Sequence, residues 1–175
     1  LAYLEVPSLD KLEQLATSIK SYGNHVTSTF KMDNRYFCPT VPISAKAFEV
    51  HGLSVRRLLQ YESSHKAKIP DDATLIIGHN INFDHRMLGK PEVQLLCTLQ
   101  LMKKLRKQRL VEIPETYNNT LDVLTSYFYG TEYDFLTKNL HDALLDCFKV
   151  VLLLKTICRY LPAESFQDLI NYGEK

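Results

Sequence analysis

Residues 74–84 read TLIIGHNINFD, and this stretch decides the predicted fold. The apolar run from Thr74 to Ile77 is typical of a short buried strand, and Gly78 permits a tight exit from it. A helical stretch, Phe83 to Leu88, follows directly, with Phe83 packing inward and Asp84 facing the strand ends. Taken alone, the stretch also fits a helix that begins with a capping asparagine and an aspartate that complements the helix dipole.

Strand-like and helix-like segments surround this stretch in an order typical of α/β domains. The segments with strand character are Ala2–Val6, Glu13–Lys20, His25–Phe37, Thr74–Ile77 and Leu95–Thr98. Two helices are expected after the capping serines Ser44 and Ser54, and another follows the strand Leu95–Thr98 and runs to Arg109. Further helices are expected over Thr120–Tyr129, His141–Tyr160 and Ala163–Tyr172. Early strands followed by strand–helix alternation predict an α/β domain in which a mixed five-stranded sheet is flanked by helices.

The size and composition of the chain fit one ordinary globular domain. With 175 residues, of which 45% are hydrophobic and 23% charged, we expect a single domain over residues 1–175. The formal net charge of +1 argues against a protein that binds polyanions through bulk charge. Any affinity for nucleic acid must therefore come from a local basic patch or from bound metal.

The cysteines and the apolar runs bear on the compartment. The four cysteines have no CxxC spacing, which argues against a zinc site or a disulfide framework. The longest purely apolar run, Val150 to Leu154, is far shorter than a membrane span, and the first residues show no signal-peptide pattern. We therefore expect a cytoplasmic protein with no membrane partner.

A second informative stretch, HDALLD at residues 141–146, opens the most hydrophobic helix of the chain. Asn139 is expected to cap this helix, which places His141 in its exposed first turn. Asp146 lies deeper and is followed by apolar residues from Phe148 to Leu154. Because a buried, unpaired carboxylate is costly, Asp146 needs compensation, which a metal ion would supply. An aspartate that turns to solvent or caps a neighbouring backbone group is the alternative.

Together, the two stretches resemble the second and third motifs of the DnaQ-like (DEDDh) 3′→5′ exonucleases. His79-Asn80 followed by Phe83-Asp84 is similar to the family's HNxxFD motif, and residues 141–146 match its HxAxxD motif. Further stretches are similar to the exodeoxyribonuclease X members of the family: Pro42-Ile43-Ser44 with Ala47 and His51, Cys97-Thr98, and Asp146-Cys147. The resemblance extends over nearly the whole chain and implies a ribonuclease H-like fold.

The resemblance implies metal-dependent hydrolysis of phosphodiester bonds at DNA 3′ ends, with release of nucleoside monophosphates. Such a reaction needs an activated water and a stabilised leaving oxygen, and two divalent ions about 3.5–4 Å apart can supply both. Carboxylates are the expected ligands because hard oxygen donors suit Mg²⁺ or Mn²⁺. The family pattern assigns metal ligation to Glu5, Asp84 and Asp146, and the role of general base to His141.

The first motif departs from the family pattern. Family members carry Asp-x-Glu at the end of the first strand, whereas this chain has Tyr3-Leu4-Glu5. A phenol with a pKa of about 10 is a poor substitute for a bridging carboxylate at neutral pH. Three interpretations stay open: a shifted match in which Asp10 contributes, a metal site with fewer ligands, and a catalytically impaired module that binds nucleic acid or a partner.

The residues expected to contact substrate are His51, Asn80, Phe83, Lys103 and Lys104. The two lysines begin the densest basic run, 103–109, whose phosphate contacts would be salt-sensitive; a solvated helix face is the alternative. The aromatic run 127–129 either offers a stacking surface for a terminal base or packs in the core. The expected partner is single-stranded DNA or a DNA 3′ end, and RNA is also possible because the fold and metals serve both polymers.

Overall fold

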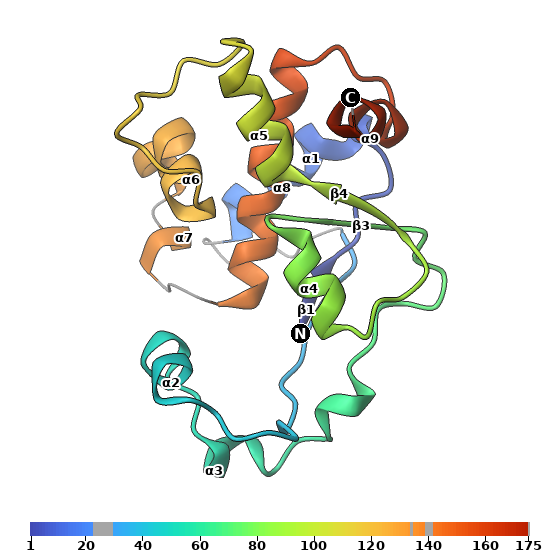
Figure 1. Ribbon diagram of the computed structural model, residues 1–175, viewed down its shortest axis with the longest axis vertical. Helices are drawn as coiled ribbons and strands as arrows, with labels where there is room; N and C mark the ends of the chain where they lie inside the picture. The colour runs from blue at the N-terminus through green and yellow to red at the C-terminus, as the bar shows by residue number, and fades with distance from the viewer. Residues whose placement is uncertain (23–29, 134, 139–141, 175) are drawn as a thin grey trace.

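The computed structural model describes residues 1–22, 30–133, 135–138 and 142–174. Figure 1 shows a body of helices around a long central helix, and an arm that extends from the body along the longest axis. The strands are β1 (Ala2–Leu4), β2 (Met32–Asn34), β3 (Leu75–Gly78) and β4 (Gln94–Cys97). The α-helices are α1 (Leu12–Tyr22), α2 (Ala45–His51), α3 (Val55–Leu58), α4 (Ile81–Met87), α5 (Thr98–Lys107), α6 (Leu121–Tyr129), α7 (Phe135–Lys138), α8 (Ala143–Tyr160) and α9 (Phe166–Glu174). Short 3-10 helices lie at η1 (Leu9–Lys11), η2 (Ser64–Lys66) and η3 (Gly130–Tyr133).

The strands pair two by two, which corrects the expected five-stranded sheet. Among the described residues, β1 pairs antiparallel with β2, with Tyr3 opposite Asp33, and β3 pairs parallel with β4, with Ile77 opposite Leu96. One pair is antiparallel and the other parallel, so neither of the two described sheets is the mixed sheet that was expected. The expected strand His25–Phe37 falls partly on residues 23–29, which lie outside the described residues, and its described part contains β2.

One of the five expected strands, Glu13–Lys20, is wrong because this segment lies in helix α1. Its apolar side chains recur at helical spacing rather than at every second position. Leu12, Leu15, Ala16 and Ile19 are each at most 4% exposed, so they form one buried stripe on α1. Burial of this stripe against α8 overrides the weaker strand character of the segment.

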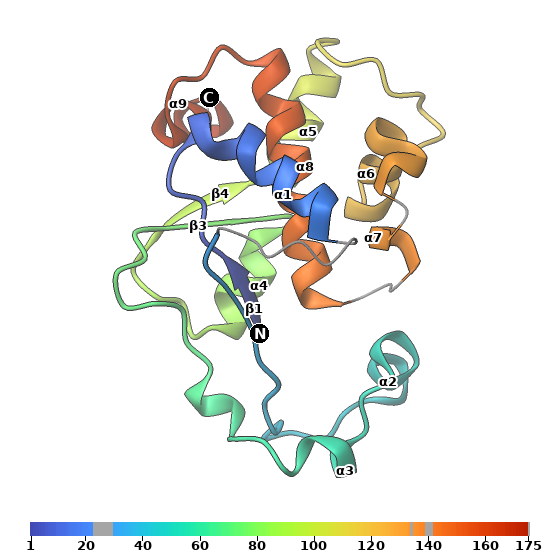
Figure 2. The same ribbon diagram turned by 180° about the vertical axis from the view of Figure 1, so that it is seen from behind.

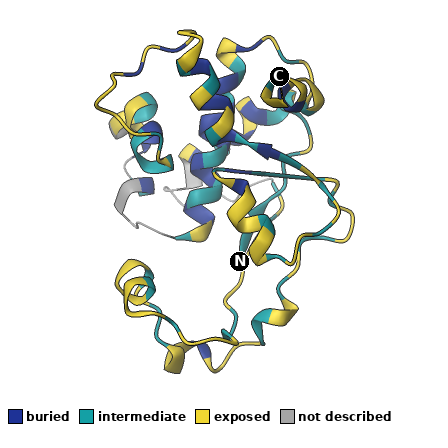
Figure 3. Cartoon of the chain, viewed as in Figure 1, coloured by how far each residue is buried: buried dark blue, intermediate teal, exposed yellow. Residues whose placement is uncertain are grey.

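Helix α8 forms the centre of the core. It packs against α1, α5, α6 and β1, and its side chains between Leu144 and Ile157 are buried on nearly every side. A helix that is apolar around most of its circumference can be stable only in the interior. Figure 3 shows the resulting band of buried residues along α8 and along the side of α5 that faces it. Seen from behind in Figure 2, α1 covers the other side of α8.

The start of α8 differs from the prediction. The N-cap is Asp142 rather than Asn139, because the Asp142 carboxylate accepts hydrogen bonds from the backbone N–H groups of Leu144 (2.9 Å) and Leu145 (3.2 Å). The helix therefore begins at Ala143 rather than at His141. An aspartate is as good an N-cap as asparagine, and it adds a charge that favours the helix dipole. Asn139 and His141 lie outside the described residues.

Residues 35–73 form the arm, which carries α2 and α3 at one end of the molecule (Figure 1). The predicted caps are confirmed, since Ser44 accepts from the Ala47 N–H (3.1 Å) and Ser54 from the Arg57 N–H (3.3 Å). Of the apolar residues after Ser54, Leu58 is buried but Leu59 is 66% exposed. The helix α3 is too short to turn a whole face towards the body.

The structure also describes the cysteines and the apolar character of the helices. The four cysteines are all described and all free thiols, with no disulfide among them. Over the described part of the chain, no helix combines the length and the apolar character needed to cross a membrane.

Replacement of Leu152 by alanine should lower the free energy of unfolding by about 2–5 kcal/mol, because it leaves a cavity in the centre of the core. The side chain of Leu152 is fully buried in α8. Urea unfolding followed by circular dichroism measures the change. The matched control is Leu59→Ala in the exposed arm, which should shift stability by less than about 0.5 kcal/mol. Equal losses in the two variants would contradict the assignment of the core to α8.

Candidate active site

The turn between β3 and α4 places Asp84 in the first turn of a helix. Gly78 ends β3 at a close approach, since a Cβ there would lie 2.6 Å from Ile81 Cδ1. Asn80 occupies the N-cap position with a left-handed backbone (φ 66°), which asparagine tolerates better than most residues, but its side chain makes no capping hydrogen bond. Ile81 fills the interior side of α4. Asp84 lies on the solvent-exposed side.

Phe83 corrects an expectation about this turn. It was expected to pack inward, yet it is 52% exposed, because Ile81 takes the inward position at the start of α4. An exposed aromatic ring one residue before Asp84 is available for contact with a ligand. The predicted role of Phe83 as a substrate contact therefore stays open.

His79 anchors the turn to two other parts of the body. Its Nε2 lies 2.7 Å from the Asn119 carbonyl oxygen, to which it must donate, and its Nδ1 lies 3.1 Å from the Thr98 hydroxyl. Thr98 is the first residue of α5, and its hydroxyl also lies 3.2 Å from the Gly78 carbonyl oxygen. Desolvation by burial lowers the pKa of His79, so the ring is neutral at pH 7. His79 thus links the turn after β3 to the start of α5 and to the loop before α6.

Asp146 lies one turn into α8 and forms an ion pair with Lys149. The Lys149 ammonium is 2.9 Å from Asp146 Oδ1 and 2.6 Å from Asp122 Oδ1 on α6, while the Lys149 side chain is 1% exposed. Burial alone disfavours the charged lysine, but the two carboxylates outweigh it and raise the pKa of Lys149 above its ordinary value. The carboxylates themselves stay in contact with solvent, with side chains 39% (Asp146) and 43% (Asp122) exposed. Asp146 is thus compensated within the protein by Lys149.

Asp84 and Asp146 lie close enough to repel each other. Partial desolvation of the Asp84 carboxyl, and then the negative charge of Asp146, raise the pKa of Asp84 above its usual range. Burial, and then the negative charges of Asp146 and Asp84, raise the pKa of the Cys147 thiol to about 12. The thiol is therefore near both carboxylates. Among the described residues, Asp146 has an ion pair, with Lys149, whereas no ion pair to Asp84 is found.

Tyr3 lies in β1 and Glu5 directly follows its end, and the alternation of side chains places both opposite Ala2, Leu4 and Val6, which pack against the core. Glu5 pairs with Lys31 at 2.5 Å, and this partner raises the pKa of Lys31. Asp10, the alternative first-motif acid, lies in η1 beyond β1 and is exposed.

The residues present fit a divalent cation between Asp84 and Asp146, and they do not fit the full expected ligand set. Carboxylate oxygens are the donors that Mg²⁺ and Mn²⁺ prefer, and a cation between two carboxylates relieves their repulsion. Within the described residues, however, no group of three or more His, Cys, Asp or Glu side chains is arranged to hold a metal ion. Glu5 therefore does not join Asp84 and Asp146 in such a group, and metal ligation by these residues stays a prediction.

The expected substrate contacts divide into two kinds. Lys103 is exposed on α5. Its positive charge adds to the desolvation that lowers the pKa of His79, so Lys103 is near the turn. Lys104 instead binds α9, where its ammonium donates to the Tyr172 carbonyl oxygen (2.5 Å) and lies 4.8 Å from the centroid of the Tyr172 ring. His51 is the last residue of α2, and its Nδ1 accepts from the Leu53 N–H (2.9 Å). Lys104 and His51 thus have structural partners that the sequence did not indicate.

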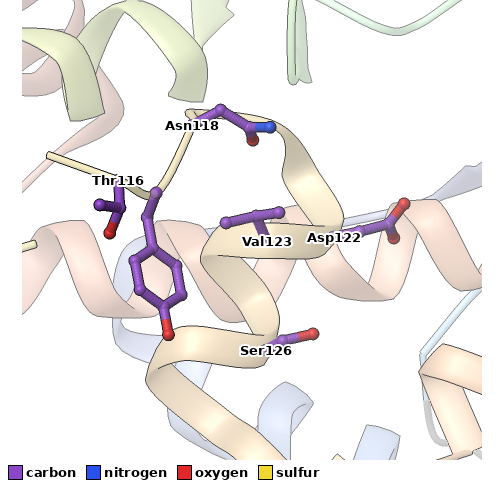
Figure 4. A pocket seen from close by; sticks show the side chains of 6 residues that line it. Thr116, Asn118, Asp122, Val123 and Ser126 are labelled. Carbon is purple, nitrogen blue, oxygen red and sulfur yellow. The ribbon is translucent and has the colours of Figure 1, made fainter. Parts of the chain in front are cut away.

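A shallow surface pocket of about 310 Å³ lies beside this region. Thr116, Tyr117 and Asn118 from the loop before α6, together with Asp122, Val123 and Ser126 of α6, line it. Figure 4 shows Asp122 and Ser126 pointing to the same side of α6. Of the aromatic run 127–129, Tyr127 stacks edge-on against Tyr117, and Tyr129 donates its hydroxyl to the Leu152 carbonyl oxygen (2.8 Å). Core packing is therefore the better interpretation for Tyr129.

Sequence reasoning missed Lys149 and Asp122. The available signal was a lysine three residues after Asp146 on an otherwise apolar helix, since a buried lysine needs a carboxylate partner. The position of Asp122 on a different helix had no signal in the sequence. The proposed general base, His141, lies outside the described residues.

Comparisons with known proteins bear on the fold. The chain matches no protein-family model and no curated protein sequence. Among solved structures it is similar to exonuclease X in complex with 5′ overhanging duplex DNA, with 20% identical residues, a TM-score of 0.56 and coverage of 81% of each chain. At this identity the likeness concerns the fold alone, so the chain shares the overall α/β fold of exonuclease X.

Proposed function

We propose that the protein is a metal-dependent 3′→5′ exonuclease that hydrolyses phosphodiester bonds at DNA 3′ ends and releases nucleoside monophosphates. The observation that carries this proposal is the proximity of Asp84 and Asp146, two motif carboxylates from different helices: partial desolvation, and then the negative charge of Asp146, raise the pKa of Asp84. The fold shared with an exonuclease bound to 5′ overhanging duplex DNA supports the substrate class. A 5′ overhang leaves a recessed 3′ end, which is the end that such an enzyme shortens.

Each residue of the proposed site has a distinct task. Asp84 and Asp146 would hold Mg²⁺ or Mn²⁺, which supplies positive charge where the phosphodiester develops negative charge. His141 would accept a proton from the attacking water. The exposed ring of Phe83 would stack on the terminal base, while Lys103 would contact the phosphate backbone. Asn80 would donate to the terminal nucleotide from the exposed N-cap of α4.

A second candidate function is a DNA-binding module that does not cut. Tyr3 stands where the family has a carboxylate, and the neighbouring carboxylate, Glu5, is paired with Lys31. Both observations weaken the first motif as a metal ligand. RNA stays a possible substrate class for either function, and a panel of matched DNA and RNA strands decides between them.

Asp84→Asn should lower the rate of nucleotide release by more than about 100-fold, because even residues that merely support a metal ligand change activity by about 10–100-fold. The substrate is a duplex with a recessed, labelled 3′ end in the presence of Mn²⁺. Asp71→Asn is the matched control, because Asp71 is an exposed aspartate of the arm that pairs with Lys68. Equal rates for Asp84→Asn and the control would refute the assignment of Asp84.

Tyr3→Asp separates the two candidate functions, because it restores the carboxylate of the first motif. If the protein binds DNA without cutting it, this variant should acquire Mn²⁺-dependent nuclease activity that the wild type lacks. If the wild type already cuts DNA, Tyr3→Asp should change the rate of that cutting rather than create a new activity. Absence of cutting by both proteins, with single-stranded DNA still bound, would favour the binding module.

Lys103→Ala should weaken DNA binding and reduce the slope of log affinity against log salt by about one unit, as expected for one lost phosphate contact. Lys104→Ala is the comparison, because Lys104 is engaged with Tyr172. It should leave the salt slope unchanged and lower the stability of the protein instead. Fluorescence anisotropy of a labelled strand at several salt concentrations measures both slopes, and equal slopes for the two variants would contradict the placement of Lys103.

A further inference from the structure

Lys149 is a buried cation in direct contact with one of the proposed metal ligands. Its side chain is 1% exposed, and its ammonium lies between Asp146 Oδ1 (2.9 Å) and Asp122 Oδ1 (2.6 Å). The two carboxylates come from α8 and α6, so the ammonium is fixed from two directions. This contact is distinct from the flexible surface pairs of the chain, such as Lys68 with Asp71, whose side chains are 70% and 85% exposed.

The ammonium restricts where a divalent ion can bind Asp146. Mg²⁺ binds carboxylate oxygens at about 2.0–2.1 Å, so an ion on Asp146 Oδ1 would lie within about 5 Å of the Lys149 ammonium. Like charges at that distance repel strongly in a partly buried site. An ion shared with Asp84, whose carboxylate repels that of Asp146, would therefore bind Asp146 through Oδ2 rather than Oδ1.

The charges of this cluster balance one divalent ion rather than two. Asp84, Asp146 and Asp122 together with Lys149 are three carboxylates and one ammonium, which leave a net charge of −2. One divalent cation neutralises this charge, whereas two would leave an excess of +2. Glu5 does not offset the excess, because its carboxylate pairs with Lys31 at 2.5 Å.

We propose that Lys149 acts as a built-in cation in place of one of the two divalent ions, so that the site holds a single ion between Asp84 and Asp146. Asp122 is a positioning residue in this arrangement. It shares the charge of Lys149 and so limits how far the ammonium neutralises Asp146. The inference rests on the proposed function, since it concerns the metal of that same site.

The test is a titration of the full chain with Mn²⁺ alone, in which the electron paramagnetic resonance signal of free Mn²⁺ gives stoichiometry and affinity. The wild type should bind one Mn²⁺. Lys149→Met should bind Mn²⁺ about tenfold more tightly, because removal of the ammonium frees Asp146 while the methionine fills the space of the lysine stem. Lys155→Met is the matched control, because Lys155 lies on the same helix but pairs with Glu13. This control should leave Mn²⁺ affinity unchanged.

A second variant, Asp122→Asn, keeps the test decisive if Lys149→Met does not fold. It leaves the ammonium to Asp146 alone, so Mn²⁺ affinity should fall severalfold. A purely structural role for the ion pair would change the urea midpoint of these variants without changing Mn²⁺ affinity, and this result would overturn the inference.

The stoichiometry separates failure of the inference from failure of the proposed function. Two Mn²⁺ ions bound per wild-type chain, with nuclease activity present, would overturn the role of Lys149 and leave the nuclease intact. A wild-type protein that binds no Mn²⁺ and cuts no DNA would overturn the proposed function itself.

Discussion

The burial of α8 between α1, α5, α6 and β1 is the interaction on which the rest of the structure depends. Apolar side chains cover this helix so completely that it can lie only in the interior, and the neighbouring helices are arranged around it. The same helix carries Asp146, Cys147 and Lys149 near its N-terminal end. The packing that stabilises the fold therefore also fixes these three side chains, and α6 is held where Asp122 reaches the Lys149 ammonium.

A second, independent set of contacts positions Asp84. The turn after β3 is joined through His79 to Thr98 at the start of α5 and to Asn119 in the loop before α6. Arg106 of α5 holds that loop in turn, by donating to the Asn119 side chain (2.8 Å) and to the carbonyl oxygens of Tyr117 and Pro114. Asp84 and Asp146 are thus positioned by two sets of contacts, one centred on α8 and one on His79, and α5 takes part in both.

The sequence predicted the elements whose signals are local. Serine caps at Ser44 and Ser54, the strand after Thr74 and the long apolar helix were found, because capping and apolar periodicity depend on neighbouring residues. The failures have two causes. The segment Glu13–Lys20 was assigned to a strand although its apolar residues recur at helical spacing, so a local signal was misread. The pairing of strands depends on contacts between distant segments, which the sequence does not show.

The candidate site shows the same division. The motif spacing predicted that Asp84 and Asp146 would lie in one site, and this stays a prediction; the negative charge of Asp146 adds to the desolvation that raises the pKa of Asp84. The sequence could not show that Lys104 binds Tyr172, because α5 and α9 meet only in the folded chain. It could not show the ion pair of Asp122 with Lys149 for the same reason.

The two unusual residues of the proposed site change its charge in the same direction. Tyr3 removes a negative charge that the family pattern would place on β1, and Lys149 adds a positive charge beside Asp146. Each change lowers the number of divalent cations needed to neutralise the carboxylates. The proposed single-ion site follows from the two features together, because one carboxylate fewer and one fixed ammonium leave less negative charge for divalent cations to neutralise.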